Sequence, residues 1–126
     1  MEEKKVKDLL ETWFNSIYHD DYGKKARTTY AKLKICGDSR TIPTTQNLYE
    51  RARRTLKARG EFREAEQDKR LVLAMGSGRN MKNPTIVELL FEKEQLKISA
   101  WAKEGLIPQK SAVTAIDVCL EDLKQN

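Results

Sequence analysis

The chain has 126 residues, of which 39% are hydrophobic and 34% charged, and its formal net charge at pH 7 is +5. This length is typical of one domain, and the aromatic and aliphatic residues are too numerous for a disordered chain. We therefore expect a single domain over residues 1–126, with a basic front half at 22–82 and an acidic helical back half at 83–126.

The sequence also limits the cellular setting. The N-terminus lacks the basic and then apolar order of a secretory signal, and no apolar run approaches the roughly 20 residues of a membrane span. Cys36 and Cys119 lack the number and spacing of a disulfide framework or a zinc site. We expect an intracellular protein, cytoplasmic or nuclear, that has no membrane partner.

The front half is predicted to be helical. Apolar residues from Val6 to Ile17 recur at helical spacing. Thr45, Leu48, Tyr49, Ala52 and Leu56 form one stripe of another helix. The predicted helices cover 2–18, 24–35, 44–59 and 61–75. Residues 36–43 are dense in turn formers and are predicted to be a loop. The short apolar run 71–75 fits a buried strand equally well, because periodicity does not separate the two structures over five residues.

The back half begins with a loop at 76–84, rich in glycine and asparagine. A capping box at Thr85–Glu88 favours a long helix that ends at Gly105. The alternative is a β-hairpin over 86–101 with its turn at 92–95. Residues 108–124 are predicted to be a final amphipathic helix. Together these elements predict a mainly all-α fold, a compact bundle of five or six helices.

Positive charge is concentrated in one segment. Residues 23–59 contain eleven lysines and arginines against Asp38 and Glu50, a net charge of +9, whereas 1–21 and 83–126 are each net acidic. Such an asymmetry favours a localised cationic surface, and the commonest partner of such a surface is a phosphate backbone. The competing explanation is that these charges only keep thin helices soluble.

We expect the predicted helices 24–35 and 44–59 to pack side by side, so that their cations form one patch. Tyr22, Tyr30 and Tyr49 would offer rings on which unpaired bases stack. Arg79 and Lys82 in the following loop extend the track. The predicted nucleic-acid-binding residues are Lys24, Lys25, Arg27, Lys32, Lys34, Arg51, Arg53, Arg54, Lys57, Arg59, Arg79 and Lys82.

Catalytic and metal sites are not expected. His19 is the sole histidine, and beside Asp20 and Asp21 it is interpreted as an exposed helix end rather than a metal corner. The glycines around Ser77 lack the Gly-Lys-Ser/Thr ending of a phosphate-binding loop and the surroundings of a nucleophile. We predict no enzyme activity, no catalytic residue, no metal and no cofactor.

The predicted function is non-enzymatic binding of nucleic acid through a basic helical surface. RNA or single-stranded DNA is favoured over specific duplex DNA, because the connection between the two basic helices is longer than that of a helix-turn-helix. The alternative is a protein-interaction or assembly subunit, an oligomeric adaptor or ribonucleoprotein component, whose basic face meets an acidic protein. Self-association into a homo-oligomer or a larger complex is left open.

Overall fold

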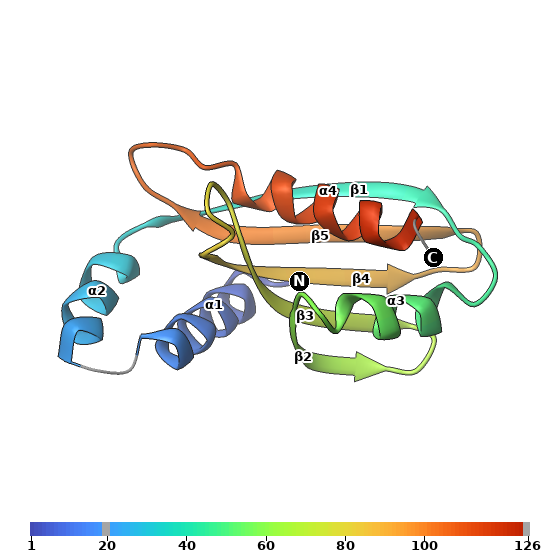
Figure 1. Ribbon diagram of the computed structural model, residues 1–126, viewed down its shortest axis with the longest axis horizontal. Helices are drawn as coiled ribbons and strands as arrows, with labels where there is room; N and C mark the ends of the chain where they lie inside the picture. Colours follow the sequence, from blue (N-terminus) through green and yellow to red (C-terminus); the bar gives the residue numbers. More distant parts are fainter. Residues whose placement is uncertain (19–20, 125–126) are drawn as a thin grey trace.

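The computed structural model describes the backbone of residues 1–18 and 21–124 and the side chains of 1–18 and 26–124. Within these ranges the protein is an α+β fold, in which four helices accompany a five-stranded antiparallel sheet (Figure 1). The helices are α1 (Glu3–Ile17), α2 (Asp21–Ala31), α3 (Leu48–Leu56) and α4 (Ser111–Lys124). The strands are β1 (Lys34–Pro43), β2 (Gly60–Glu66), β3 (Arg70–Ser77), β4 (Asn83–Phe91) and β5 (Gln95–Glu104). The prediction of an all-α helical bundle is therefore wrong.

The strand order across the sheet is β1-β5-β4-β3-β2. Strands β2 to β5 follow one another through hairpins, so that each lies beside its neighbour in sequence. β1 instead pairs with β5 along its whole length, from Lys34 opposite Glu104 to Pro43 opposite Gln95. α3 connects β1 to β2 and thus carries the chain from one edge of the sheet to the other.

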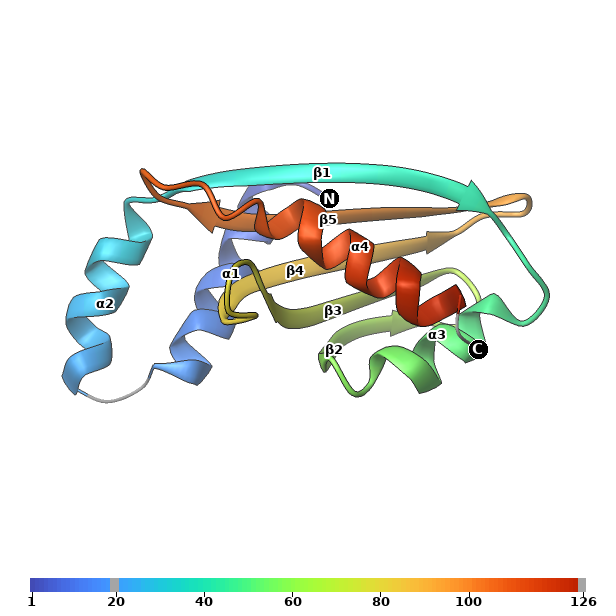
Figure 2. The ribbon, with the colours of Figure 1, turned by 45° about the horizontal axis from the view of Figure 1, so that its top comes forward.

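The main hydrophobic core lies between the sheet and the pair of helices α3 and α4 (Figure 2). Alternate side chains of the central strands point to this side, among them Leu73 and Leu89, and meet Leu56 of α3 and Ile116 of α4. All four of these side chains are fully buried. Burial of a side chain of this size contributes about 1.5–3 kcal/mol, so this layer is the principal source of stability.

α1 covers part of the opposite face of the sheet. Its Val6 and Leu10 pack in a second cluster with Val72, Ala74 and Ile86. The indole nitrogen of Trp13 donates a hydrogen bond to the backbone oxygen of Met75 at 3.0 Å. α2 follows α1 and extends beyond the end of the sheet, held by stacking of Tyr30 on Phe14 with ring centroids 4.1 Å apart (Figure 2).

The predicted helix over 61–75 is instead the β2–β3 hairpin. β3 is buried on both faces, because Leu71 and Leu73 face α3 and α4 while Val72 and Ala74 face α1. A strand covered on both sides has no polar alternation, and its sequence resembles that of a buried helix segment. The alternative that 71–75 is a buried strand is confirmed.

The predicted helix from Thr85 to Gly105 is also wrong, and its hairpin alternative is confirmed. β4 and β5 pair from Thr85 opposite Ala102 to Phe91 opposite Leu96, with the turn at 92–95. β4 is buried on both faces like β3, so its apolar residues match a helical stripe by coincidence of spacing. The loop predicted at 36–43 is part of β1, an edge strand whose small polar residues resemble those of a turn.

Four helices are found close to their predicted places. α1 and α4 agree with the predicted ranges 2–18 and 108–124, α2 ends several residues before Ile35, and α3 begins later than Thr44. Amphipathic helices at the surface were therefore identified correctly, whereas the half-exposed strands β1 and β2 and the buried strands β3 and β4 were assigned to a loop or to helices.

A first prediction concerns Gly60, where β2 meets β3. A Cβ atom at this position would lie 1.9 Å from the backbone oxygen of Ala74, whereas one at Gly105 would come no nearer than 3.8 Å to Leu33. Gly60→Ala should lower the free energy of unfolding by about 1–3 kcal/mol, measured by urea denaturation. Gly105→Ala is the control, and an equal loss in both variants would contradict the steric explanation.

A second prediction separates the two cysteines. Cys36 is exposed and Cys119 is buried in the main core, where burial raises the pKa of its thiol to about 12. At pH 8 such a thiol is ionised in about one molecule in ten thousand. A thiol reagent should therefore modify Cys36 in the native protein and Cys119 only after unfolding. Rapid labelling of the native Cys36→Ser variant would contradict this assignment.

Candidate nucleic-acid interface

The predicted packing of the two basic helices does not occur. α2 packs against α1 beyond one end of the sheet, and α3 lies on the other face of the sheet beside α4 (Figures 1 and 2). β1, which was predicted to be a loop, separates the two helices along the chain. The predicted binding residues are therefore distributed over two separate surfaces.

The first surface lies at the end of the sheet where β1 and β4 begin. Lys32 comes from the connection between α2 and β1, Lys34 is the first residue of β1, and Arg79 and Lys82 come from the β3–β4 turn. Lys110, which sequence reasoning missed, comes from the loop between β5 and α4. Three strand spacings of about 4.8 Å separate β1 from β3, so the strands at this end span about 14 Å between them. We call this set of five side chains the strand-end surface.

Hydrogen bonds hold the two loops of the strand-end surface together. The backbone N–H of Arg79 donates to Oε1 of Gln109 at 3.3 Å. Asn83 Nδ2 donates to the Lys103 backbone oxygen at 3.1 Å and to Ser111 Oγ at 2.8 Å. Gly78 has a φ of +83°, and a Cβ there would lie 2.5 Å from Gln109. A glycine at 78 therefore allows the turn to reach the β5–α4 loop.

The acidic side chain at this end is engaged in the fold. Glu104 accepts hydrogen bonds from the backbone N–H groups of Gln109, at 3.1 Å, and Ser111, at 2.8 Å. It thereby satisfies free amides at the start of α4, where negative charge is favoured by the helix dipole. The five cations of the strand-end surface are all exposed, and none forms an ion pair with another residue of the described ranges.

Lys103 lies close to these cations but has a structural role. Its side chain is buried, and Nζ donates to the backbone oxygens of Tyr30 at 3.3 Å and Ala31 at 3.5 Å. The same nitrogen lies 3.8 Å from a carboxylate oxygen of Glu11. Burial lowers the pKa of Lys103. This lysine therefore connects β5 to the C-terminal end of α2 and to α1.

The second surface is the outer face of α3. Of the predicted packing stripe, Leu48, Tyr49, Ala52 and Leu56 are buried, whereas Thr45 is exposed and precedes the helix, and Arg53, Arg54 and Lys57 are exposed. The prediction that one face of this helix packs while the other is cationic is therefore confirmed. We call Arg53, Arg54 and Lys57 the α3 surface.

Several predicted residues already have partners within the fold. Arg59 binds Asp122 of α4 with two hydrogen bonds of 2.7 and 3.0 Å, and Arg51 donates to Thr45. Arg27 donates to the backbone oxygen of Tyr18 at 2.9 Å and so connects α2 to the end of α1. These arginines are less accessible to a phosphate than the unpaired cations of the two surfaces.

Other predicted residues fall partly outside the described part of the chain. Lys24 and Lys25 belong to α2, but their side chains lie outside the described residues, as does that of Tyr22. His19 and Asp20 lie outside them altogether. Tyr30 and Tyr49 are each only 5% exposed, so the expectation that their rings stack on bases is wrong.

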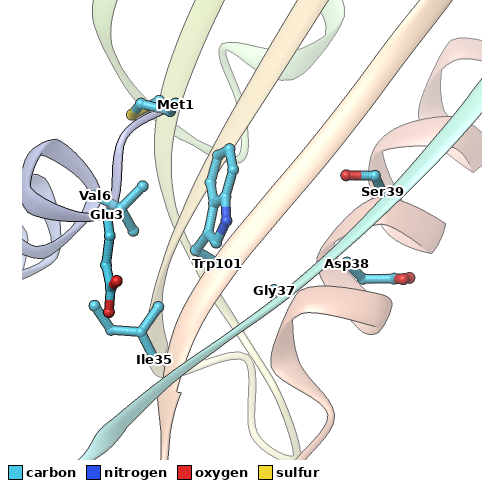
Figure 3. A pocket seen from close by; sticks show the side chains of 8 residues that line it. All are labelled: Met1, Glu3, Val6, Ile35, Gly37, Asp38, Ser39 and Trp101. Carbon is cyan, nitrogen blue, oxygen red and sulfur yellow. The ribbon is translucent and has the colours of Figure 1, made fainter.

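A hollow of about 400 Å³ lies between α1 and β1 on the other face of the sheet (Figure 3). Trp101 forms one side of it, and its indole lies across Gly37, where a Cβ atom would be 2.5 Å from the ring. The lining includes the acidic residues Glu3 and Asp38 and no lysine or arginine. The hollow is therefore unsuited to phosphate and does not extend the cationic surfaces.

Within the described ranges, no group of three or more histidine, cysteine, aspartate and glutamate side chains is placed to hold a metal ion. No helix in the described part of the chain is both long and apolar enough to cross a bilayer.

Comparison with known proteins gives no assignment. The chain matches no protein-family model, no curated protein sequence and no solved structure. Its function is therefore argued from the geometry and charge of the molecule itself.

Proposed function

We propose that the protein is a non-enzymatic nucleic-acid-binding protein and that the strand-end surface is its main contact with phosphate. The observation that carries this proposal is the convergence of five exposed cations from three separate chain segments, none paired with an acid in the described ranges. A group of exposed cations without neighbouring carboxylate partners produces a local positive potential that attracts a polyanion.

The dimensions of this surface suit a nucleic-acid strand. The strands that carry these cations span about 14 Å, or three strand spacings, which is long enough to contact more than one phosphate of a single strand. Lysines and arginines at this spacing would position the backbone without reading its sequence. Arg79 adds a guanidinium that can donate two parallel hydrogen bonds to one phosphate.

RNA or single-stranded DNA remains the favoured ligand. α2 and α3 are separated by β1 and so do not form a helix-turn-helix. Met81, Leu106 and Ile107 are exposed apolar side chains in the same two loops as the cations. Unpaired bases expose apolar faces that such side chains can contact, whereas a duplex exposes mainly its phosphates.

One observation favours the alternative function of a protein-interaction or assembly subunit. Leu106 is fully exposed and Ile107 is 71% exposed, next to each other in the β5–α4 loop. Neighbouring apolar side chains flanked by cations would also fit a partner protein with an acidic rim around an apolar pocket.

A matched pair of triple variants tests the proposal. Lys34→Gln/Arg79→Gln/Lys82→Gln removes three charges from the strand-end surface, and Arg53→Gln/Arg54→Gln/Lys57→Gln removes three from the α3 surface. Binding of labelled single-stranded RNA, single-stranded DNA and duplex DNA is measured by fluorescence anisotropy at several salt concentrations. The first variant should bind more weakly, with a slope of log affinity against log salt smaller by about 2, because three phosphate contacts are lost.

The α3 variant should retain nearly all of the affinity and slope of the wild-type protein. Equal losses in the two variants would contradict the assignment to the strand-end surface. Absence of binding by the wild-type protein at low salt would overturn nucleic-acid binding and favour a protein partner. Tighter binding of duplex DNA than of either single strand would overturn the preference for unpaired ligands.

A further inference from the structure

β1 presents an open backbone edge. It pairs with β5 through ten consecutive residues on one side, and no helix or strand of the described residues pairs with its other side (Figures 1 and 2). An open edge of this length is a template on which another strand can add.

The register identifies which backbone groups point outward from β1. Just beyond the strand, the N–H of Thr44 donates to the oxygen of Glu94 at 3.1 Å, in the same register as the β1–β5 pairing. Hydrogen-bonded positions alternate along an antiparallel pair, so the even-numbered residues of β1 bond to β5. The N–H groups of Ile35, Gly37, Ser39 and Thr41 therefore point outward, and no backbone oxygen among the described residues accepts them.

Pro43 agrees with this assignment. It belongs to the odd-numbered set, and its missing N–H therefore removes no hydrogen bond from the β1–β5 ladder. Proline in sheets is found at such outward-facing positions of edge strands.

The opposite edge of the sheet is more strongly protected than β1, whose charges and proline leave the small residues 36–39 accessible. β2 is shorter, contains a bulge between Phe62 and Glu64, and has a high density of charged side chains. Bulges and charges prevent edge-to-edge pairing. β1 has no bulge in its ten-residue register, and Cys36, Gly37, Ser39 and Thr41 expose only small side chains.

We propose that β1 pairs with β1 of a second copy of this chain, antiparallel about a two-fold axis at Ser39. In this register the outward-facing residues pair with one another, Ser39 with its own counterpart and Gly37 with Thr41 of the second copy. Asp38 then lies opposite Arg40 of the second copy, and by symmetry Arg40 lies opposite Asp38. These positions are not hydrogen-bonded between strands, and their side chains approach closely, with Cα atoms about 4.5 Å apart.

Charge complementarity selects this register over its neighbours. If the axis moves by one residue, the outward-facing residues of the two strands still pair with one another. An axis at Asp38 places Asp38 opposite Asp38 of the second copy, and an axis at Arg40 places Arg40 opposite Arg40. Like charges directly opposite one another are unfavourable in a sheet. Arg40 already contacts Asp117 of α4, so in the dimer it would lie between two carboxylates. Two copies would share one continuous sheet, and this association requires no nucleic acid.

The test begins with the mass of the protein in solution, measured by light scattering after size exclusion over a range of concentrations. The expected mass of the wild-type protein is twice the chain mass of 14.6 kDa. Ser39→Pro removes an outward N–H at the two-fold axis without touching the β5 ladder, and should be monomeric. Ser39→Ala is the matched control, because it also loses the 2.8 Å contact between Ser39 Oγ and Ser99 Oγ. It keeps the outward backbone N–H and should therefore remain dimeric.

A charge exchange tests the register without a proline. Asp38→Arg and Arg40→Asp each set like charges opposite one another and should each reduce dimerisation at least tenfold. The double variant restores both opposite-charge pairs and should recover the dimer. Arg40→Asp also removes the contact of Arg40 with Asp117 of α4, and Asp117→Asn is the control for that loss. A wild-type protein that is monomeric at all concentrations would overturn the proposal. A dimeric Ser39→Pro variant, or a monomeric double variant, would overturn it as well.

Discussion

Burial of β3 and β4 on both faces is the constraint on which the rest of the structure depends. Apolar residues stand in consecutive positions, from Leu71 to Met75 in β3 and from Ile86 to Phe91 in β4 except at the buried Glu88, so one layer of helices can cover only half of them. α3 and α4 enclose one side, and α1 encloses the other through Val6 and Leu10. α1 covers only part of its face of the sheet, so the fold has one complete helical layer and one incomplete layer. The hollow beside Trp101 lies on this second face, where α1 leaves β1 uncovered.

The elements that could be predicted from the sequence are the helices with one exposed face, whereas β2, which also has one, was predicted to be part of a helix. α1, α3 and α4 each have an apolar stripe opposite charged residues, and this periodicity specifies a helix without knowledge of the partner. β3 and β4 have no wet face, so their sequences lack the alternation that identifies a strand. β1 was missed for a different reason, since Gly37, Asp38 and Ser39 favour turns locally. Only the pairing of β1 with β5, distant in sequence, stabilises the extended conformation.

The cationic residues show the same limit. Charge density along the sequence correctly indicated exposed cations such as Lys34 and Arg53, but it does not determine which of them lie together. β1 and α3 carry the basic segment across the full width of the sheet, so its two halves lie on different surfaces. Lys110 was missed because it belongs to a segment with net negative charge, and its position becomes apparent only when the β5–α4 loop meets the β3–β4 turn. Tyr49 lay on the predicted packing stripe of its helix, and that signal could have excluded it as a stacking ring.

The position of β1 at the far edge has a consequence for the order of folding. Strands β2 to β5 are connected by successive short-range hairpins, whereas β1 pairs with β5, the last strand of that meander along the chain. Closing so long a loop costs chain entropy before any contact compensates for it. We expect β1 to dock last, which leaves the outer edge of β5 temporarily unpaired. During that interval β1 from another chain competes for the same edge, so the topology favours exchange of this strand between chains when the protein folds at high concentration.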